Sequence, residues 1–295
     1  MIKRPSTDAI KTRAMIKKDE SHDVSDKAPG TFRTKWARRQ PARALREVVQ
    51  VVGLRTILHA EVSVDVQGLD QVRDLKGPAL IVANHSSHLD TALLLCTLPA
   101  SRRRRTAVAA AKDYFFDTWW RGVGSAIAFN TFPIDRHAGS LSATPGALLA
   151  DGWSVLLYPE GTRSRDGFLG RFRLGAAWLA AQHQVPIIPV GLRGSYAAMP
   201  RGRNWPVKGR PRVSVRYGPP ILPVPGQSPR ELAPQISAAV KQLIEEDTST
   251  WWQAQQPQAD VVPSEPPAGS WRRIWQQTEP PAPGGRTERP KIWRN

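Results

Sequence analysis

The feature that most constrains the fold is an alternation of short apolar runs with helical patterns through the middle of the chain. The apolar runs have the length of buried strands, and stretches with apolar residues at helical spacing separate them. Such alternation is typical of α/β proteins, in which helices cover the faces of a sheet. We therefore expect an α/β fold with a mixed, largely parallel central sheet flanked by helices.

The expected strands occupy residues 61–66, 79–83, 106–111, 131–134, 154–158, 185–190 and 213–217. The expected helices occupy residues 44–57, 90–98, 114–129, 140–150, 173–183 and 229–246. Polar and apolar residues alternate cleanly over residues 61–66, which indicates an edge or half-exposed strand. Pro186 and Pro189 cannot donate backbone hydrogen bonds, so the run at 185–190 is expected at an edge or as a wall.

Composition separates a core from two tails. Residues 1–42 are polar, basic and mixed in charge, and residues 253–295 carry eight prolines with little apolar periodicity. We expect both tails to be disordered and residues 43–252 to fold. No signal peptide and no run near the roughly 18 apolar residues of a membrane span is present. The chain is expected to be soluble or held at a membrane surface without crossing it. Its one cysteine, Cys96, permits no internal disulfide, which fits a reducing compartment.

The net charge of +17 implies a polyanionic partner, which is nucleic acid, anionic lipid or a phosphorylated metabolite. The helix at 44–57 has an apolar side of Leu45, Val48, Val49 and Val52 and a polar side of Arg46, Glu47 and Gln50. Its apolar side either packs on the core, which we favour, or lies on a lipid surface. Four arginines at 102–105 are expected to add to a basic, membrane-contacting surface. Residues 119 and 120 are both tryptophan and fit an acyl-chain groove, a headgroup interface or the core.

A histidine and an aspartate follow the expected strand at 79–83. His85 and Asp90 are five residues apart, which in a uniform helix leaves them about 140° apart around the axis. They meet only if His85 lies in a turn and Asp90 lies in the first turn of the next helix. There Asp90 would accept from one ring nitrogen and leave the other to act as a base. Alone, the pair is equally well explained by a helix-capping aspartate beside an unrelated histidine.

Three more segments lie at the ends of expected strands, where α/β proteins usually place their sites. Residues 132–136 end in Arg136, residues 158–164 form a glycine turn after a strand, and residues 185–190 contain the two prolines. Gly161 allows backbone amides to approach an anion, and Arg163 offers a planar fork for a phosphate. Singly, each has a structural explanation, such as Glu160 pairing with Arg163. Together they describe a site that deprotonates a hydroxyl on a phosphate-bearing substrate.

The four segments, in this order, resemble the four conserved blocks of the 1-acyl-sn-glycerol-3-phosphate acyltransferase (PlsC) family of glycerolipid acyltransferases. Residues 84–90 read Asn-His-Ser-Ser-His-Leu-Asp and resemble block one, and the other three segments resemble blocks two to four. The resemblance covers roughly residues 60–220. It implies the glycerolipid acyltransferase fold and an O-acyltransferase of phospholipid biosynthesis, which transfers an acyl chain to lysophosphatidic acid and forms phosphatidic acid.

The resemblance also implies roles for residues. His85 would be the general base, and Asp90 would orient it, so that the acceptor hydroxyl attacks an acyl thioester directly. Acyl-CoA or acyl-ACP would be the co-substrate, with no cofactor and no metal. The acceptor would be bound by Arg136, Glu160, Gly161, Thr162 and Arg163. Unlike many family members, this chain has no N-terminal membrane span, so its basic surface is expected to contact an anionic membrane from the cytoplasmic side.

Other acceptors and other functions also fit parts of the sequence. Another lysophospholipid, glycerol 3-phosphate or a glycolipid hydroxyl would suit the same chemistry. A non-enzymatic nucleic-acid-binding protein explains the charge but not the four ordered segments, and no nucleic-acid-binding motif occurs, so nucleic acid is not expected. His85 and His88 have metal-ligand spacing, yet no third ligand follows at the usual distance.

Overall fold

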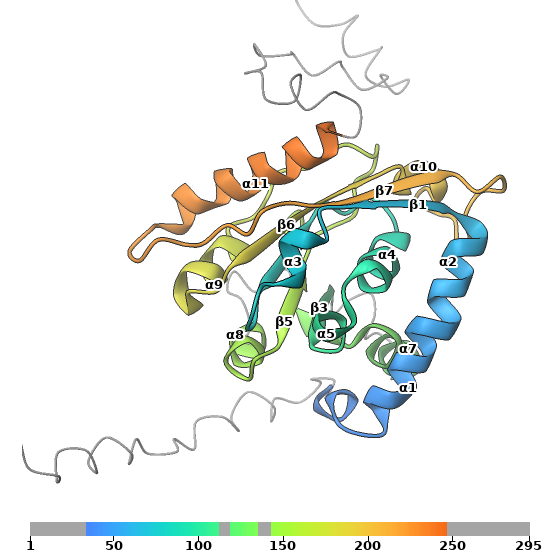
Figure 1. Ribbon diagram of the computed structural model, residues 1–295, viewed down its shortest axis with the longest axis horizontal. Coiled ribbons are helices and arrows are strands. Elements are labelled where there is room, and N and C mark those ends of the chain that lie inside the picture. Colours follow the sequence, from blue (N-terminus) through green and yellow to red (C-terminus); the bar gives the residue numbers. More distant parts are fainter. Residues whose placement is uncertain (1–33, 112–118, 135–142, 247–295) are drawn as a thin grey trace, which may run out of the picture. The chain divides into compact units, whose positions relative to one another are not determined.

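A computed structural model describes residues 34–111, 119–134 and 143–246 of the protein (Figure 1). The expected tails at 1–42 and 253–295 lie outside these residues, apart from 34–42, so their disorder stays a prediction.

A seven-stranded sheet forms the centre of the described residues, with strand order β1-β7-β6-β2-β5-β3-β4. Strands β6, β2, β5, β3 and β4 run parallel, while β7 pairs antiparallel with β6 and parallel with β1. The predicted mixed, largely parallel sheet is confirmed, and β1 lies at its edge as expected. The strands are β1 (Ser63–Gln67), β2 (Leu80–Ala83), β3 (Thr106–Ala111), β4 (Thr131–Ile134), β5 (Ser154–Leu157), β6 (Ile187–Arg193) and β7 (Arg212–Tyr217).

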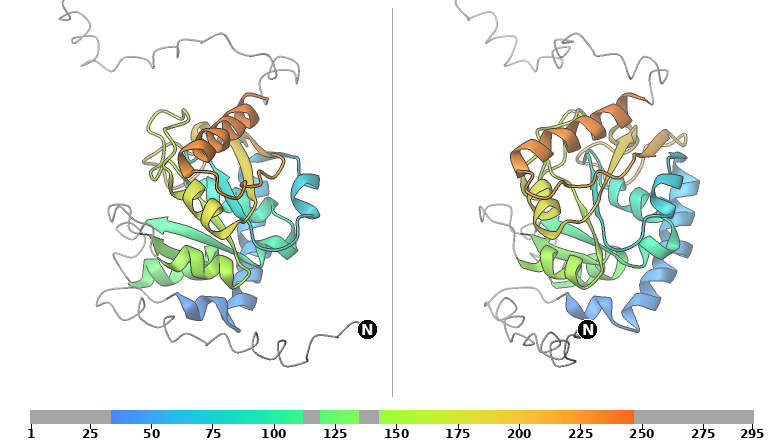
Figure 2. Two further views of the ribbon diagram at one scale, coloured as in Figure 1. Left: turned by 90° about the vertical axis from the view of Figure 1, so that its left-hand side faces the viewer. Right: turned by 60° about the vertical axis from the view of Figure 1, so that its left-hand side comes forward.

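Helices cover both faces of the sheet, as the turned views show (Figure 2). The longer helices lie close to the predicted ranges, and the one-turn helices were not expected because four residues carry no readable periodicity. The helical segments are η3 (Lys35–Arg38), α1 (Ala42–Val48), η4 (Val49–Leu54), α2 (Arg55–Glu61), α3 (Asp70–Arg73), α4 (Leu89–Thr97), α5 (Ala100–Arg103), α7 (Trp119–Phe129), α8 (Ala143–Ala150), α9 (Gly175–His183), α10 (Ser195–Ala198) and α11 (Pro229–Glu245).

Each central strand is buried on both faces, and its side chains alternate between two apolar cores. In β2, Ile81 packs with α4 and β7, whereas Leu80 and Val82 pack with α8, α9 and α11. This two-sided burial explains why the central strands read as continuous apolar runs rather than as alternating patterns.

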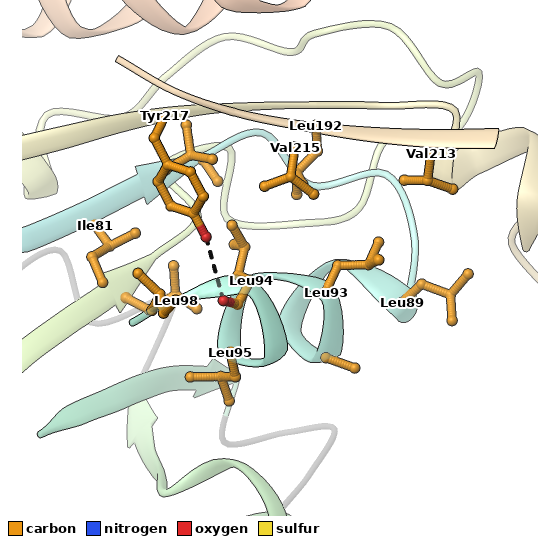
Figure 3. Close-up of a cluster of buried hydrophobic side chains, with 14 of the residues drawn as sticks. Ile81, Leu89, Leu93, Leu94, Leu95, Leu98, Leu192, Val213, Val215 and Tyr217 are labelled. Atoms are coloured by element: carbon orange, nitrogen blue, oxygen red, sulfur yellow. Dashed lines mark hydrogen bonds between the residues drawn. The ribbon is translucent and has the colours of Figure 1, made fainter. Parts of the chain in front are cut away.

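Helix α4 packs against the sheet through leucines and so fixes the position of Asp90. Leu89, Leu93 and Leu94 face Val213, Val215 and Tyr217 of β7 (Figure 3). Burial of each leucine contributes about 1.5–3 kcal/mol. The Tyr217 hydroxyl lies 3.4 Å from the Leu94 carbonyl oxygen, to which it donates.

The proline-containing strand is central, so its predicted edge position is wrong. Strand β6 lies between β2 and β7, and Pro189 is paired with Val82 of β2. On the other side β7 pairs with β6 only from Val190 onward, and the carbonyl of Pro189 accepts the Gly218 N–H at 2.9 Å. Strand β7 has ended at that point, so no strand residue lies opposite Pro189 to accept a backbone hydrogen bond from it.

The first long helix, residues 42–61, faces the core with polar residues that were expected to face solvent. It runs through α1, a π-helical segment (η4) and α2. Arg46 and Gln50 are buried, while Leu45, Val48 and Val52 are 49%, 57% and 64% exposed. The prediction that the apolar side packs on the core is therefore wrong for these three residues, whereas Val49 is half-buried and Leu58 of α2 lies in the core.

The end of α7 explains this orientation. The last carbonyls of a helix have no partner within it, and a cation or an amide can satisfy them. Arg46 donates to Ile127 O at 3.0 Å and to Ala126 O at 2.9 Å, and Gln50 donates to Ala128 O at 2.8 Å. Burial lowers the pKa of Arg46 to about 10, with Arg38 and Arg43 adding repulsion, so the side chain stays charged at neutral pH.

Arg102 and Arg103, half of the arginine block at 102–105, are buried. The predicted membrane contact is therefore wrong for these two residues. Arg102 donates to the carbonyls of Gly77 and Leu75 and to Ser154 Oγ. Arg103 is buried and donates to Glu47 at 2.6 Å. Arg104 and Arg105 remain exposed.

Candidate active site

The candidate site lies where β2 and β5 end side by side. These strands are parallel, and Val82 is in register with Leu157. The turn after β2, residues 84–88, therefore lies next to the turn after β5, residues 158–164. The main chain joins the two turns directly, because Ser164 N–H donates to the carbonyl of His85 at 2.7 Å.

His85 and Asp90 meet as their spacing predicted. Helix α4 begins at Leu89, which places Asp90 in its first turn. The Oδ2 of Asp90 lies 2.9 Å from His85 Nδ1 and accepts the backbone N–H groups of Ser86 at 2.7 Å and Ser87 at 2.8 Å. With the proton on Nδ1, Nε2 of the imidazole is left as the basic nitrogen.

The second carboxylate oxygen of Asp90 has a different environment. Asp90 is fully buried, and its Oδ1 has no hydrogen-bond partner among the described residues. A buried carboxylate held in this way is costly unless a positive charge pairs with it. An imidazolium on His85 would supply that charge at the moment when the histidine has taken a proton.

Glu160 connects the two turns through its carboxylate. Its Oε1 accepts the backbone N–H of His85 at 2.7 Å, and its Oε2 accepts that of Gly170 at 2.8 Å. Burial raises the pKa of Glu160, and the two backbone hydrogen bonds oppose that shift. The carboxylate thus holds the main chain of His85 in place.

Tyr158 covers one face of the imidazole. The two rings are stacked, with centroids 4.0 Å apart and planes inclined by 16°. The tyrosine hydroxyl lies 3.0 Å from the Thr91 hydroxyl. Burial, with the nearby Asp90 carboxylate, raises the pKa of Tyr158, so it stays a neutral phenol at physiological pH.

The turn after β5 gathers positive charge beside this histidine. Gly161 has φ +73°, and a Cβ there would lie 2.9 Å from Arg173 Nε, so only glycine permits this approach. Burial lowers the pKa of His88 to about 4, and the charge of Arg163 adds to the shift. His88 is therefore a neutral imidazole at pH 7, next to a guanidinium.

The residues that carry this arrangement are similar to a known protein family. Residues 63–193 match the family model described as Acyltransferase. Those residues form an acyltransferase-family domain. The match contains all of the candidate site residues, from His85 to Arg163, and it confirms the family predicted from the four segments. The relatives are named as acyltransferases, which agrees with the predicted enzyme class.

The similar proteins are 1-acyl-sn-glycerol-3-phosphate acyltransferases. One from Brassica napus, chloroplastic, is 32% identical over 140 residues, which is 47% of this chain and 39% of that protein. One from Limnanthes douglasii is 28% identical over 177 residues, 58% of this chain and 59% of that protein. The human beta enzyme is 36% identical over 120 residues, 38% of this chain and 40% of that protein. The chain thus spans only about half the length of these relatives.

A solved structure supports the fold. The 1-acyl-sn-glycerophosphate acyltransferase PlsC from Thermotoga maritima superposes with a TM-score of 0.56 at 21% sequence identity. The superposition covers 83% of this chain and 89% of that one. The predicted glycerolipid acyltransferase fold is confirmed.

Most of the predicted site residues of this domain lie together at the ends of β2 and β5. His85, Asp90 and Glu160 are linked by hydrogen bonds, and Gly161, Thr162 and Arg163 follow in the adjoining turn. Arg136 lies outside the described residues, so its predicted part stays a prediction. Cys96 is unsuited to act as a nucleophile, because burial raises its pKa to about 11.

Three residues that support the candidate site were not predicted from the sequence. Tyr158 was part of a quoted segment but had no assigned role, and Arg173 was not noticed. Asn84 pairs with Leu192 of β6 through both ends of its amide, each at 2.8 Å, and so closes the end of β2 onto β6. Nothing in the local pattern identifies Tyr158 and Asn84, because their hydrogen-bond partners lie 67 and 108 residues away.

Proposed function

We propose that this chain transfers an acyl chain from an acyl thioester to the free hydroxyl of lysophosphatidic acid, giving phosphatidic acid. The observation that carries the proposal is the buried Asp90 carboxylate on Nδ1 of His85, in a domain of the acyltransferase family. The names of its relatives supply the acceptor. No cofactor or metal enters the proposed reaction.

The chemistry needs one base and no covalent enzyme intermediate. Nε2 of His85 takes the proton of the acceptor hydroxyl as the oxygen attacks the thioester carbonyl. The developing imidazolium is balanced by Asp90 at 2.9 Å. The tetrahedral intermediate then collapses with cleavage of the carbon–sulfur bond. The thiolate of coenzyme A or acyl carrier protein takes the proton from His85, which restores the base.

The turn after β5 supplies the proposed site for the acceptor's phosphate. Arg163 offers a planar fork and Thr162 offers a backbone N–H group, a combination that suits a phosphate. The N–H of Gly161 donates to the carbonyl of Tyr158 at 3.0 Å, so Gly161 shapes the turn. Arg136 completes the set as predicted from the sequence, and we add Arg173, which lies against Gly161. Both oxygens of Glu160 accept backbone N–H groups, so we assign Glu160 to holding the turn rather than the acceptor.

We further propose that the protein works at the cytoplasmic face of an anionic membrane as a peripheral protein. No helix among the described residues is long and apolar enough to cross a bilayer. The outward stripe of Leu45, Val48 and Val52 suits burial at the level of the lipid headgroups. Trp119 and Trp120 are 74% and 58% exposed, which excludes core packing for both and suits the same interface.

The direct test is acyl transfer by the purified protein. Labelled acyl-CoA or acyl-ACP is incubated with lysophosphatidic acid, other lysophospholipids, glycerol 3-phosphate and a glycolipid acceptor. We expect the highest kcat/KM with lysophosphatidic acid and a loss of about 10³-fold or more in His85→Ala, because the base is removed. His59→Ala is the matched control, since His59 is an exposed histidine on α2.

The outcomes separate the alternatives. Preference for another acceptor would keep the chemistry and change the substrate. Equal transfer by wild type and His85→Ala would remove His85 as the base. The absence of transfer to every acceptor would overturn the proposed function.

A further inference from the structure

We infer that Tyr158 is a positioning residue for His85, which holds the imidazole by its face while Asp90 holds it by its edge. The inference rests on the proposed function, in which His85 is the base, and it deepens it by naming a second group that orients this base.

The two contacts hold different parts of the ring. Asp90 binds one edge atom, Nδ1, at 2.9 Å, and this single hydrogen bond restrains rotation of the ring plane only weakly. Tyr158 lies nearly parallel to the imidazole with centroids 4.0 Å apart, which blocks that rotation on one side. Together the contacts fix where Nε2 points, and this direction decides whether an acceptor hydroxyl is in line.

Tyr158 is itself firmly placed. It follows the last residue of β5, which pairs with β2 on one side and β3 on the other. Its hydroxyl bonds the hydroxyl of Thr91 in the first turn of α4, directly after Asp90. Asp90 and Tyr158 are thus both tied to the first turn of α4, so the edge and the face of the imidazole are held relative to the same helix.

An aromatic face also has an electrostatic effect on this base. The π-face of a tyrosine ring attracts a cation, so stacking favours the imidazolium that forms when His85 takes a proton. Other charges around the two rings are those of Asp90 and Arg163, with Glu160 behind the main chain and neutral His88 beside it. None of these changes when Tyr158 is replaced by another uncharged residue.

The test compares Tyr158→Phe with Tyr158→Leu. Phenylalanine keeps the ring and loses only the bond to Thr91, so we expect its kcat within about threefold of wild type. Leucine removes the stacked face, so we expect kcat to fall about tenfold or more with the KM of both substrates little changed.

Tyr196→Leu is the matched control. Tyr196 also contacts the turn after β5, through the carbonyl of Arg165, but does not touch His85. We expect its kcat and KM to match those of wild type. Circular dichroism and thermal unfolding establish that each variant is folded.

A measurement independent of turnover keeps this inference separate from the proposed function. In the ¹H NMR spectrum, the ring protons of His85 should be shifted upfield by the stacked ring in wild type and Tyr158→Phe, and not in Tyr158→Leu. Absence of acyl transfer in wild type with this pattern intact would refute the function and leave the positioning role. Unchanged ring shifts in Tyr158→Leu would overturn the inference. An equal loss of kcat in the Phe and Leu variants would also overturn it, because the hydroxyl rather than the stacked face would then be responsible.

Discussion

The carboxylate of Glu160 accepts the backbone N–H of His85 at 2.7 Å, although the two residues are 75 positions apart. The other oxygen accepts the N–H of Gly170, so one side chain joins the turn after β2 to the loop that follows β5. The proposed base is therefore held at its main chain, its ring edge and its ring face by three separate residues.

Glu160→Gln should impair both catalysis and stability. An amide has one acceptor oxygen, so its NH₂ group would face either the His85 or the Gly170 N–H. We expect a decrease of about 2 kcal/mol in the free energy of unfolding and about 10- to 100-fold in kcat. Denaturant unfolding and steady-state kinetics measure the two effects. Glu231→Gln is the control, because Glu231 accepts a backbone N–H in the capping box of α11. Wild-type kcat in Glu160→Gln would show that this clamp does not support the reaction.

Arg46→Ala should destabilise the protein through the end of α7. The change removes the guanidinium donors to the carbonyls of Ala37, Ala126 and Ile127, of which Ala126 O keeps the N–H of Asn130 as a donor. We expect the free energy of unfolding to fall by about 2–4 kcal/mol. Chemical denaturation measures it, with exposed Arg39→Ala as the control, for which little change is expected. Equal stability of the two variants would contradict the capping role.

Replacing Leu45, Val48 and Val52 together by serine should weaken membrane binding without unfolding the chain. The three side chains are exposed, so their removal costs little packing, yet it removes the apolar area available to a bilayer. We expect the partition onto anionic liposomes at low salt to fall about tenfold or more. Leu222→Ser with Val224→Ser is the matched control, because these residues are 68% and 61% exposed. Equal loss in both variants would remove this stripe as the membrane contact.

Stability should decrease as the pH falls from 7 to 5 because of His88. Its pKa is lowered to about 4 in the folded protein by burial and by Arg163. An unfolded histidine takes a proton near pH 6.5, so in this range the unfolded chain binds more protons than the folded one. The free energy of unfolding should fall by about 2 kcal/mol between pH 7 and pH 5 from this residue. Urea titrations of wild type and His88→Asn at the two pH values give the difference, and parallel changes in both would refute it.

Local patterns predicted the elements and the central pair well. The alternation of apolar runs placed the long strands and helices, because backbone periodicity depends on neighbouring residues. The His85–Asp90 contact was readable for the same reason, since both residues belong to one turn and the start of one helix. Pairing of Glu160 with His85 was not readable, because it depends on β5 lying beside β2 in one particular register.

The sequence by itself determined which segments are strands and helices, and the family to which the domain belongs. Only the tertiary structure decided which side of each segment faces inward. Residues 44–57 were rightly expected to be helical, but Arg46 and Gln50 bind carbonyls at the end of α7, and this turns Leu45, Val48 and Val52 outward. Strand β6 tolerates Pro189 at the centre of the sheet because β7 has already ended there. In both cases the outcome depends on hydrogen-bonding groups from distant parts of the chain, and the periodicity of one segment contains no information about them.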